Sequence, residues 1–458
     1  MTLRYRSSRG DAPSLDFGDV LLTGLAPDGG LFVPETYPTL PAIDPEAPYA
    51  EVAAAVMWPF VAGVIERGDF EEIVAEAYAT FDDPAVCPLH RLDDRRWLLE
   101  LFHGPTIAFK DVALQLVGRL FDHVLAERGR RATIVVATSG DTGSAAMHGC
   151  LGRDALDCVV LFPAGRVSDV QRRQMTTLDA PNVHAFSVEG TFDDCQDLVK
   201  AAFADRAFRD EVSLSAMNSI NWGRVMAQVV YYVTAAQGLR AAGETTAPVF
   251  SVPTGNFGNV LAGWVAQRMG LEVSGFVVAS NTNDILTRWL DGGVLEMDGV
   301  VPTISPSMDI QVSSNLERLL FELLDRSGQA TAELMRDFRA TGRVRAPRPE
   351  GWWGARLDDD DTRAVIRDVH RDTGVLLDPH SAIGVGAVDR VVDLPDAPVV
   401  CLATAHPAKF PDAVEAATGL RPALPARLDG LFDREERMGH LHADLEAVEG
   451  AVRRVRVR

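Results

Sequence analysis

The sequence predicts an α/β protein built on buried parallel sheets with helices on both faces. From about residue 97 onward, short apolar, β-branched runs alternate with amphipathic stretches, which is the pattern of βαβ units. Glycine-rich turns follow several of these runs, as expected where a strand ends and a helix begins. With 458 residues the chain is too long for one small core, so we expect two or three domains.

The expected elements start with a mixed leading segment, residues 1 to about 85. Within it, Asp28-Gly29-Gly30 predicts a turn, and residues 49–65 predict helical structure. Residues 112–125 place their apolar side chains on one face at helical spacing, which predicts an amphipathic helix. The strand-like runs are residues 133–137, 158–162, 247–252, 275–279 and 398–403.

Residues 341–361 predict a crossing over the surface, because prolines, glycines and charges are concentrated there. Four consecutive aspartates, Asp358 to Asp361, end this segment. They could bind a cation, but such a run more often starts a solvated helix, where carboxylates face the positive end of the helix dipole.

Composition and charge exclude several classes of protein. No stretch of about eighteen apolar residues occurs, and Met1 to Gly10 has no apolar core behind its arginines, so we expect a cytoplasmic protein. A formal charge of -21 argues against general nucleic-acid binding. The five cysteines are scattered without a Cys-x-x-Cys spacing, which indicates reduced thiols rather than metal ligands.

Lysine is rare in this chain, so each lysine is considered as a candidate for a chemical role. Of the 44 lysines and arginines, three are lysines: Lys110, Lys200 and Lys409. A lysine amine can form a Schiff base, whereas an arginine cannot and stays charged. Lys200 has the context of an exposed helical residue. Lys110 is the stronger candidate for chemistry, and Lys409 is its rival.

The first loop whose residues suggest a catalytic role covers residues 100–111. A Gly-Pro pair marks a turn, and Lys110 stands where the helix of residues 112–125 begins. An amine beside Phe109 at a helix N-terminus meets a positive dipole and a dry environment, and both favour its neutral, nucleophilic form. The alternative is a surface lysine near a helix start.

Two further loops each follow a predicted strand and precede a predicted helix. Residues 137–144 combine hydroxyls, small residues and free amides, which suit a carboxylate or phosphate. Residues 251–260 contain two glycines around Asn-Phe, so the backbone can approach an anion closely, and they match neither the Walker loop nor the dinucleotide turn. Each loop could instead be a turn that only satisfies its own amides.

Together these segments resemble the threonine synthase family. Phe-His-Gly-Pro-Thr-x-Ala-Phe-Lys-Asp, Ala-Thr-Ser-Gly-Asp-Thr-Gly, Asn-Ser-Ile-Asn at 218–221, Val-Pro-Thr-Gly-Asn-Phe-Gly-Asn and Thr-Ala-His-Pro-Ala-Lys-Phe at 404–410 occur in that family's order and spacing. The similarity runs over most of the chain and includes the leading Asp-Gly-Gly-Leu-Phe-Val-Pro. It implies a pyridoxal 5′-phosphate (PLP) enzyme of fold type II, the tryptophan-synthase-β-like class, with the cofactor in the cleft between two parallel-sheet α/β domains.

The domain plan that we expect has three parts. A leading mixed N-terminal domain would cover residues 1–90, and the PLP-dependent core would cover 91–420. A smaller α/β subdomain, at about 125–215, would be inserted in the larger one. Residues 421–458 would form a C-terminal helical tail.

The resemblance assigns a role to each cofactor-binding position. Lys110 matches the Schiff-base lysine. Asp141 would lie near the ring hydroxyl of the cofactor, and Thr404 matches the hydroxyl partner of the pyridine nitrogen, which would leave that nitrogen largely unprotonated. The cradle for the cofactor phosphate is matched by Gly255, Asn256, Phe257, Gly258 and Asn259.

The substrate-binding positions form two groups. The residues implied around the substrate carboxylate are Ser139, Asp141 and Thr142. Those implied around the substrate phosphate are Ser219, Arg224 and Asn256. Trp222-Gly223 departs from the family pattern, which leaves the direction of Arg224 open. No metal is implied.

The reaction implied is the conversion of O-phospho-L-homoserine and water to L-threonine and phosphate, the last step of threonine biosynthesis. Lys110 would remove the α-proton, and Arg224 would hold the departing phosphate. The protein would act as a monomer or homodimer without nucleic-acid or membrane partners. Two alternatives stay open: a serine/threonine dehydratase or phospho-lyase that releases a keto acid, and a PLP-free phosphate-binding protein.

Overall fold

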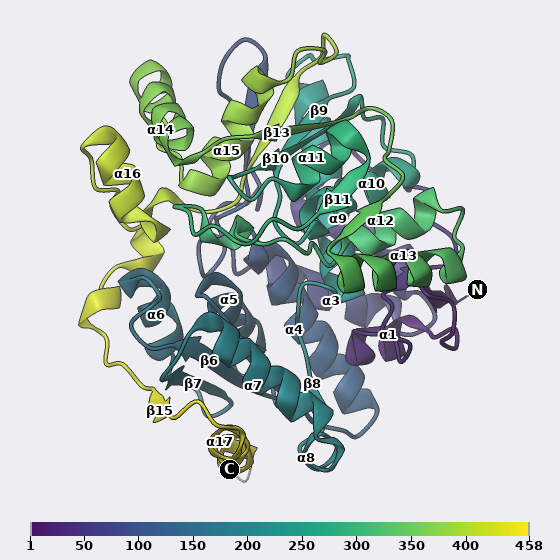
Figure 1. Cartoon of the computed structure of the whole chain (residues 1–458), viewed down its shortest axis with the longest axis vertical. Coiled ribbons are helices and arrows are strands. Elements are labelled where there is room, and N and C mark those ends of the chain that lie inside the picture. Colours follow the sequence, from purple (N-terminus) through teal and green to yellow (C-terminus); the bar gives the residue numbers. More distant parts are fainter. Residues whose placement is uncertain (1, 457–458) are drawn as a thin grey trace.

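Two sheets organise the structure, a computed structural model that describes residues 2–456 (Figure 1). The larger sheet has the spatial order β13 (Trp352–Arg356), β10 (Gly275–Ser280), β9 (Val249–Pro253), β14 (Val399–Ala403), β4 (Arg96–Glu100) and β3 (Leu89–Arg91). Its strands run parallel except for the antiparallel edge pair of β4 and β3. Every residue of β9, β10 and β14 is buried, as expected where helices cover both faces.

The smaller sheet is wholly parallel and occupies the lower part of Figure 1. Its spatial order is β15 (Gly439–Leu441), β7 (Val183–Val188), β6 (Leu156–Pro163), β5 (Ala132–Ala137) and β8 (Leu214–Ser215). The helices that accompany it are α5 (Asp141–Cys150), α6 (Asp169–Thr176), α7 (Phe192–Ala204) and α8 (Arg206–Glu211). Val159 and Leu161 of β6 join the cluster beneath α7, whereas Val160 and Phe162 join the main core, so both faces of the sheet are covered.

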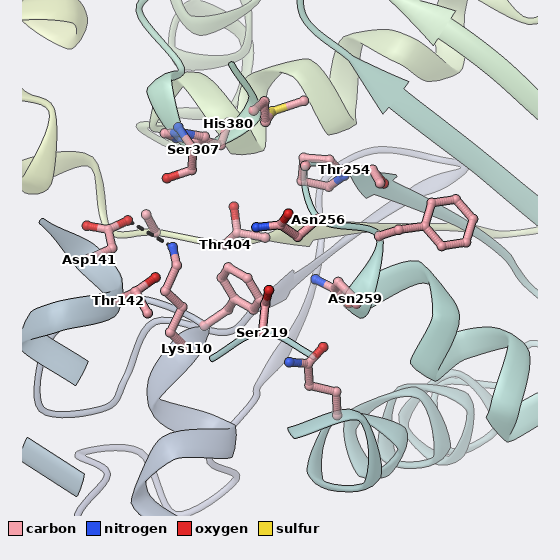
Figure 2. A pocket seen from close by; sticks show the side chains of 18 of the residues that line it. Lys110, Asp141, Thr142, Ser219, Thr254, Asn256, Asn259, Ser307, His380 and Thr404 are labelled. Atoms are coloured by element: carbon pink, nitrogen blue, oxygen red, sulfur yellow. Dashed lines mark hydrogen bonds and ion pairs between the residues drawn. The ribbon is translucent and has the colours of Figure 1, made fainter. Parts of the chain in front are cut away.

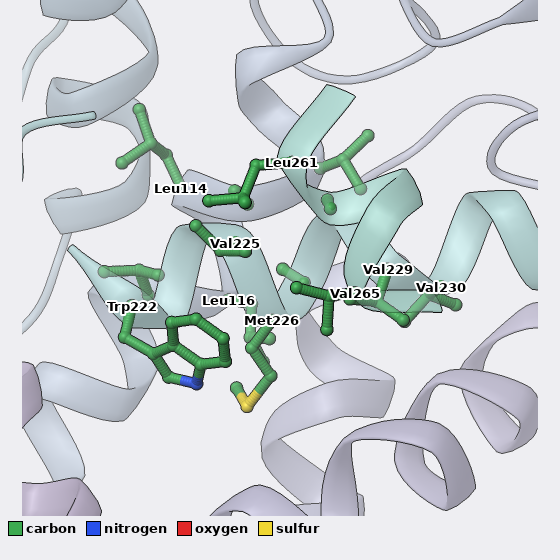
Figure 3. Packing of buried hydrophobic residues seen from close by; sticks show 14 of the residues in the cluster. Leu114, Leu116, Trp222, Val225, Met226, Val229, Val230, Leu261 and Val265 are labelled. Carbon is green, nitrogen blue, oxygen red and sulfur yellow. The ribbon is translucent and has the colours of Figure 1, made fainter. Parts of the chain in front are cut away.

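Helix α4 (Lys110–Glu127) joins the two sheets. It packs against α5 on one side and against α9 (Trp222–Ala241) on the other. A Cβ on Gly118 of α4 would lie 2.1 Å from the carbonyl oxygen of Gly149 in α5, so two glycines let these helices touch. Figure 3 shows the apolar side of the α9 contact, where Leu114 and Val225 lie near Leu261 of α10 (Gly258–Arg268).

The other helices surround the larger sheet and a small antiparallel ribbon. The helices are α11 (Ile285–Gly292), α12 (Leu316–Leu323), α13 (Gly328–Thr341), α14 (Asp359–Thr373), α15 (Pro379–Ala387) and α16 (Pro411–Thr418). The ribbon consists of β11 (Val294–Glu296) and β12 (Arg343–Arg345).

The N-terminal segment packs directly on the core. Its elements are β1 (Tyr5–Ser7), α1 (Phe17–Thr23), β2 (Phe32–Pro34), α2 (Tyr49–Val61) and α3 (Arg67–Tyr78). Trp222, the first residue of α9, contacts Tyr5 and Phe60, with ring centroids 5.9 and 5.8 Å apart. At Gly223, a Cβ would lie only 3.1 Å from a methyl of Leu21, so glycine allows close packing. The Trp-Gly pair that departs from the family pattern is therefore a packing feature.

The structure confirms the core elements that the sequence predicts. The apolar runs correspond to β5, β6, β9, β10 and β14, and residues 112–125 lie within α4. All five cysteines are buried free thiols, as expected.

The prediction for residues 341–361 is wrong in one respect. β13 lies within this segment and pairs with β10 as an edge strand of the larger sheet, and the Trp352 ring lies 4.7 Å from that of Phe276. The strand is short and follows a glycine, so its pattern is weak. The helix start after it is confirmed, because the Asp358 carboxylate caps α14 by accepting from the amide of Asp361.

The C-terminal segment returns from the larger sheet to the smaller one, along the yellow trace in Figure 1. It passes through turns at Ala426–Leu428 and Leu431–Asp433, adds β15 beside β7, and ends in α17 (Leu445–Arg456) against α7. The segment expected to be a helical tail thus also supplies a strand. Between residues 2 and 456, no helix combines the length and apolarity needed to cross a membrane.

Candidate active site

The three predicted loops meet in one pocket between the two sheets. Its free space, including the mouth, is about 730 Å³, which suits a cofactor with a small substrate. Figure 2 shows Lys110, Asp141 and Thr142 on one side, and Asn256, Asn259 and Thr404 across from them. Strands β5, β9 and β14 each end at this pocket, because the carboxyl ends of parallel strands present their loops on one edge.

Lys110 is held at the first position of α4 by a strained loop. Ile107 has φ of 53°, a left-handed conformation that a β-branched residue rarely adopts. The loop is fixed by a bridge between Ala108 and Ala405, and the amide of Phe109 donates to the carbonyl of Thr404 at 2.8 Å. The backbone that carries the amine is therefore tied to the end of β14.

The Lys110 amine is buried and paired with one carboxylate. Its Nζ lies 3.1 Å from Oδ2 of Asp141 and 4.9 Å from the ring centre of Phe109, and the residue is only 8% exposed. Burial lowers the pKa of Lys110, although the Asp141 carboxylate opposes that shift. A neutral amine is accordingly easier to reach here than at the surface, as nucleophilic attack on an aldehyde requires.

The glycine loop after β9 has the form of an anion cradle. A Cβ on Gly255 would lie 2.4 Å from the carbonyl oxygen of Ser307, so only glycine fits. Phe257 adopts φ of 64°, and its ring stacks on Trp352 at 5.9 Å, which holds the strained residue in place. Helix α10 starts at the next residue, so its free amides face the pocket.

Asn259 supplies a donor that no described residue satisfies. Its Oδ1 accepts from the hydroxyls of Tyr231 at 2.6 Å and Tyr232 at 3.0 Å, which fixes the amide plane. Its Nδ2 is buried without a hydrogen-bond partner among the described residues, and the side chain lines the pocket. A buried donor of this kind is costly unless a ligand accepts from it.

Arg224 lines the same pocket, and no carboxylate of residues 2–456 pairs with it. It is 4% exposed, and its Nε and Nη1 have no hydrogen-bond partner in the described part of the chain. Burial lowers the pKa of Arg224 to about 10, and its position in the first turn of α9 places it at the positive end of that helix. Only an anionic ligand would offset the cost of burying this unpaired guanidinium. Ser219 lines the same pocket and could contribute a hydroxyl to such a ligand.

A buried network fixes Thr404 at the end of β14. Its amide donates to Oγ of Ser381 at 3.0 Å, and that hydroxyl donates to the carboxylate of Asp378. The other carboxylate oxygen of Asp378 lies 2.8 Å from Nδ1 of His380. The Nε2 of His380 accepts from the amide of Ser307 at 3.2 Å, which implies a neutral ring. The Asp378 carboxylate therefore positions two parts of the pocket lining, Thr404 and His380.

Most predicted site residues come together. The pocket lining contains all of them but one: Lys110, Asp141, Thr142, Ser219, Arg224, Gly255, Asn256, Phe257, Gly258, Asn259 and Thr404. Ser139 does not join the lining; it lies exposed in the turn before α5.

Several lining residues were not predicted from the sequence. Gln228 lies one turn after Arg224 on α9, so helical spacing could have found it. His380 follows an Asp-Pro helix start in an otherwise apolar helix, which is a weaker signal. Ser307 belongs to a short 3₁₀ turn that has no distinctive pattern.

These groups fit PLP. The buried amine of Lys110 suits its aldehyde, and the Gly255 loop with the unpaired Asn259 amide suits its phosphate. The hydroxyl of Thr404 suits a pyridine nitrogen, because it can donate without carrying charge.

Comparisons with known proteins identify the family. The model for the threonine synthase N terminus matches residues 4–78, that for pyridoxal-phosphate dependent enzymes matches 85–405, and that for the threonine synthase C-terminal region matches 381–452. A threonine synthase from Pseudomonas aeruginosa is 53% identical over 98% of each chain. PLP-bound threonine synthase from Brucella melitensis is 52% identical with a TM-score of 0.95, and the yeast threonine synthase structure is 36% identical with a TM-score of 0.93, each over 99% of both chains. The chain therefore belongs to the threonine synthase family of PLP-dependent enzymes.

Proposed function

We propose that the chain converts O-phospho-L-homoserine and water into L-threonine and phosphate. The observation that carries this choice of substrate is Arg224, a buried guanidinium without a carboxylate partner in the described chain, on the same pocket as Lys110. A dianionic phosphate on the substrate would satisfy it, whereas serine or threonine would leave it unpaired.

The cofactor would be held at both ends. Lys110 would carry it, the cradle from Gly255 to Asn259 would accept its phosphate, and Thr404 would face the ring nitrogen. Asp141 would lie near the ring hydroxyl. When bound, PLP supplies an electron sink that acidifies the α-carbon of the substrate.

The residues of the chain would then handle protons and charge. Thr142 would bind the substrate carboxylate, and Ser219, Arg224 and Asn256 would hold the substrate phosphate. The Lys110 amine, once free, would take the proton from the α-carbon. Loss of a proton from the β-carbon would then expel the phosphate from the γ-carbon, and Arg224 would stabilise that phosphate as its charge grows. Addition of water at the β-carbon and return of one proton each to the γ- and α-carbons would complete the exchange.

Product analysis tests the reaction. Incubation with O-phosphohomoserine should yield L-threonine and phosphate in equal amounts. A keto acid with ammonia would instead identify a dehydratase or phospho-lyase and contradict the proposal.

A second measurement tests the role of Lys110. The purified protein should be yellow, and borohydride should fix the chromophore to the one peptide that contains Lys110. Label on Lys200 or Lys409 would overturn that role, and a protein that stays colourless with added PLP would favour the PLP-free alternative. The small number of lysines makes the peptide map simple to interpret.

We further propose a cytoplasmic enzyme, monomeric or homodimeric, with the three-domain plan given above. Five buried free thiols support a reducing compartment. Size-exclusion chromatography with light scattering tests the oligomeric state, and cell fractionation tests the location.

A further inference from the structure

Lys409 lies behind the pocket, in the turn Pro407–Lys409 after β14. Its side chain is fully buried, and its Nζ lies 2.9 Å from Oδ1 of Asp141 and 2.9 Å from the carbonyl oxygen of Thr106. It does not line the pocket. The carbonyl anchors the amine independently of the carboxylate, so the ammonium has a fixed position.

Asp141 therefore faces two lysines at once. Its Oδ2 lies 3.1 Å from Nζ of Lys110, whereas its Oδ1 is shared by Lys409 and by the Nε2 of Gln171, also at 2.9 Å. The Gln171 amide lies against Gly140, where a Cβ would come within 2.4 Å of it, so the turn before α5 is fitted to this arrangement. Two of the three lysines of the chain converge on one buried carboxylate.

The Lys110–Asp141 and Lys409–Asp141 ion pairs differ in whether the cation can change its charge when the cofactor binds. Lys110 lines the pocket, and its charge changes when its nitrogen bonds the cofactor and loses a proton, whereas Lys409 is fully buried and does not line the pocket. A buried carboxylate that loses its only cation costs several kcal/mol or takes up a proton. A second cation that stays in place avoids both outcomes.

We propose that Lys409 is a positioning residue that keeps Asp141 charged and correctly placed while Lys110 is bonded to the cofactor. It is a permanent counter-ion for Asp141, not a rival of Lys110 for the cofactor. Through Asp141, it also sets how tightly the nitrogen of Lys110 holds a proton.

The surrounding charges agree with this role. Burial favours the protonated form of Asp141, but Lys110, Lys409 and the Gln171 amide together hold the pKa of Asp141 well below its usual range. Burial lowers the pKa of Lys110, Asp141 opposes that shift, and the charge of Lys409 adds to the lowering. The other charged or titratable groups facing these three are Arg224, Asp111, His148 and Arg427.

The inference rests on the proposed attachment of the cofactor to Lys110, and its test measures colour rather than turnover. The visible absorbance of the holoprotein is titrated with pH for wild type, Lys409→Met, Lys409→Arg, Gln171→Leu and Lys200→Met. Without the Lys409 charge, a proton on the Lys110 nitrogen is opposed by one cation fewer. The midpoint of the absorbance titration should therefore lie at higher pH in Lys409→Met than in wild type, by roughly one to two pH units.

The controls separate charge from packing. Gln171→Leu removes a neutral donor from the same carboxylate oxygen and should shift the midpoint much less. Lys409→Arg should restore the midpoint, and Lys200→Met, at an exposed lysine, should leave it unchanged. An unchanged midpoint in Lys409→Met, or an equal shift in Gln171→Leu, overturns the inference.

Two further outcomes are also decisive. If Lys409→Met cannot hold the cofactor, a wild-type midpoint in Lys409→Arg supports the role of the charge, and a shifted or colourless Arg variant overturns it. A failure of the proposed function would differ from both, because wild type would then be colourless or carry the cofactor on another lysine.

Discussion

Two buried arginines show why burial alone does not mark a binding residue. Arg318 is as enclosed as Arg224, and burial lowers the pKa of each to about 10. Arg318, however, donates to the carbonyls of Phe32 at 2.9 Å and Ile220 at 2.6 Å, so it joins the N-terminal segment to the core. Arg224 has unused donors and faces the pocket. The difference between a structural and a ligand-binding arginine lies in these partners.

Replacing Arg224 by Leu should therefore affect substrate more than cofactor. Loss of charge-assisted contacts to the substrate phosphate should lower kcat/KM for O-phosphohomoserine by about ten- to a hundredfold, with part of the loss in kcat. Steady-state kinetics and the visible spectrum provide the measurements. Arg240→Leu, at the exposed end of the same helix, is the matched control. Normal turnover by Arg224→Leu would show that the phosphate is held elsewhere.

Thr404 allows a second test of a single hydroxyl. Its backbone is fixed through Phe109 and Ser381, so Thr404→Ala should fold and bind PLP normally. Loss of one hydrogen bond, about 0.5–1.5 kcal/mol, should slow turnover by roughly two- to tenfold and change the cofactor spectrum. Thr404→Ser should retain most of the activity. If the alanine variant matches wild type in both spectrum and rate, the hydroxyl is only structural.

At the scale of elements, two of the six described non-glycine residues with positive φ lie in the loops that carry Lys110 and the Gly255 cradle. Ile107 precedes α4 and Phe257 precedes α10, and both have left-handed backbone angles that their side chains disfavour. Ile107 is enclosed by Val170, Leu428 and Leu431, so the C-terminal segment holds the lysine loop. Such strain persists only where tertiary packing imposes it.

The cradle permits a test at Gly255. In Gly255→Ala the new methyl would meet the backbone of Ser307, so the loop must shift and PLP affinity should fall by at least about tenfold. Spectrophotometric titration of the cofactor-depleted protein measures the affinity. Gly68→Ala, where nothing lies within 4 Å of the new Cβ, should bind PLP like wild type. Equal affinity in both variants would show that the loop does not hold the cofactor phosphate.

At the scale of the whole molecule, the C-terminal segment links the two sheets. Arg427 donates to the carbonyls of His103 and Thr80, at 2.6 and 2.8 Å, beside the lysine loop. Glu436 then pairs with Arg172 and Arg173 of α6 before β15 extends the smaller sheet. The C-terminal segment is thus a strap between the two sheets, and the charges of its Arg427 and Arg434 act on His148.

This arrangement predicts a pH dependence of stability centred on His148. Burial, with the charges of Arg427, Lys409 and Arg434, lowers the pKa of His148 to about 4 from an ordinary 6.5. Between pH 4 and pH 6.5, His148 binds a proton in the unfolded chain but not in the folded protein. The contribution of neutral His148 to the free energy of unfolding is therefore complete above pH 6.5 and is lost as pH falls towards 4.

Thermal unfolding of wild type and His148→Gln from pH 4 to 8 measures that contribution. The difference in Tm between the two proteins should be constant above pH 6.5 and should change in favour of the variant as pH falls. Taking the difference cancels other titrating groups, including Asp111, whose pKa burial raises to about 6. A pH-independent difference would contradict the prediction.

The sequence by itself determined the features that depend on neighbouring residues. The strands β5, β6, β9, β10 and β14, the loops after them and the start of α4 are local patterns, so the fold class, the place of Lys110 and both glycine loops could be predicted. The motifs in register also predicted the family and the cofactor, which the comparisons confirm.

The tertiary structure decided which side chains meet. Lys409 beside Asp141, His380 beside Ser307, β13 beside β10 and the Arg224 Nε and Nη1 without hydrogen-bond partners among residues 2–456 all depend on how distant segments of the chain come together. No local spacing encodes these contacts, because they arise only when the sheets and the strap assemble.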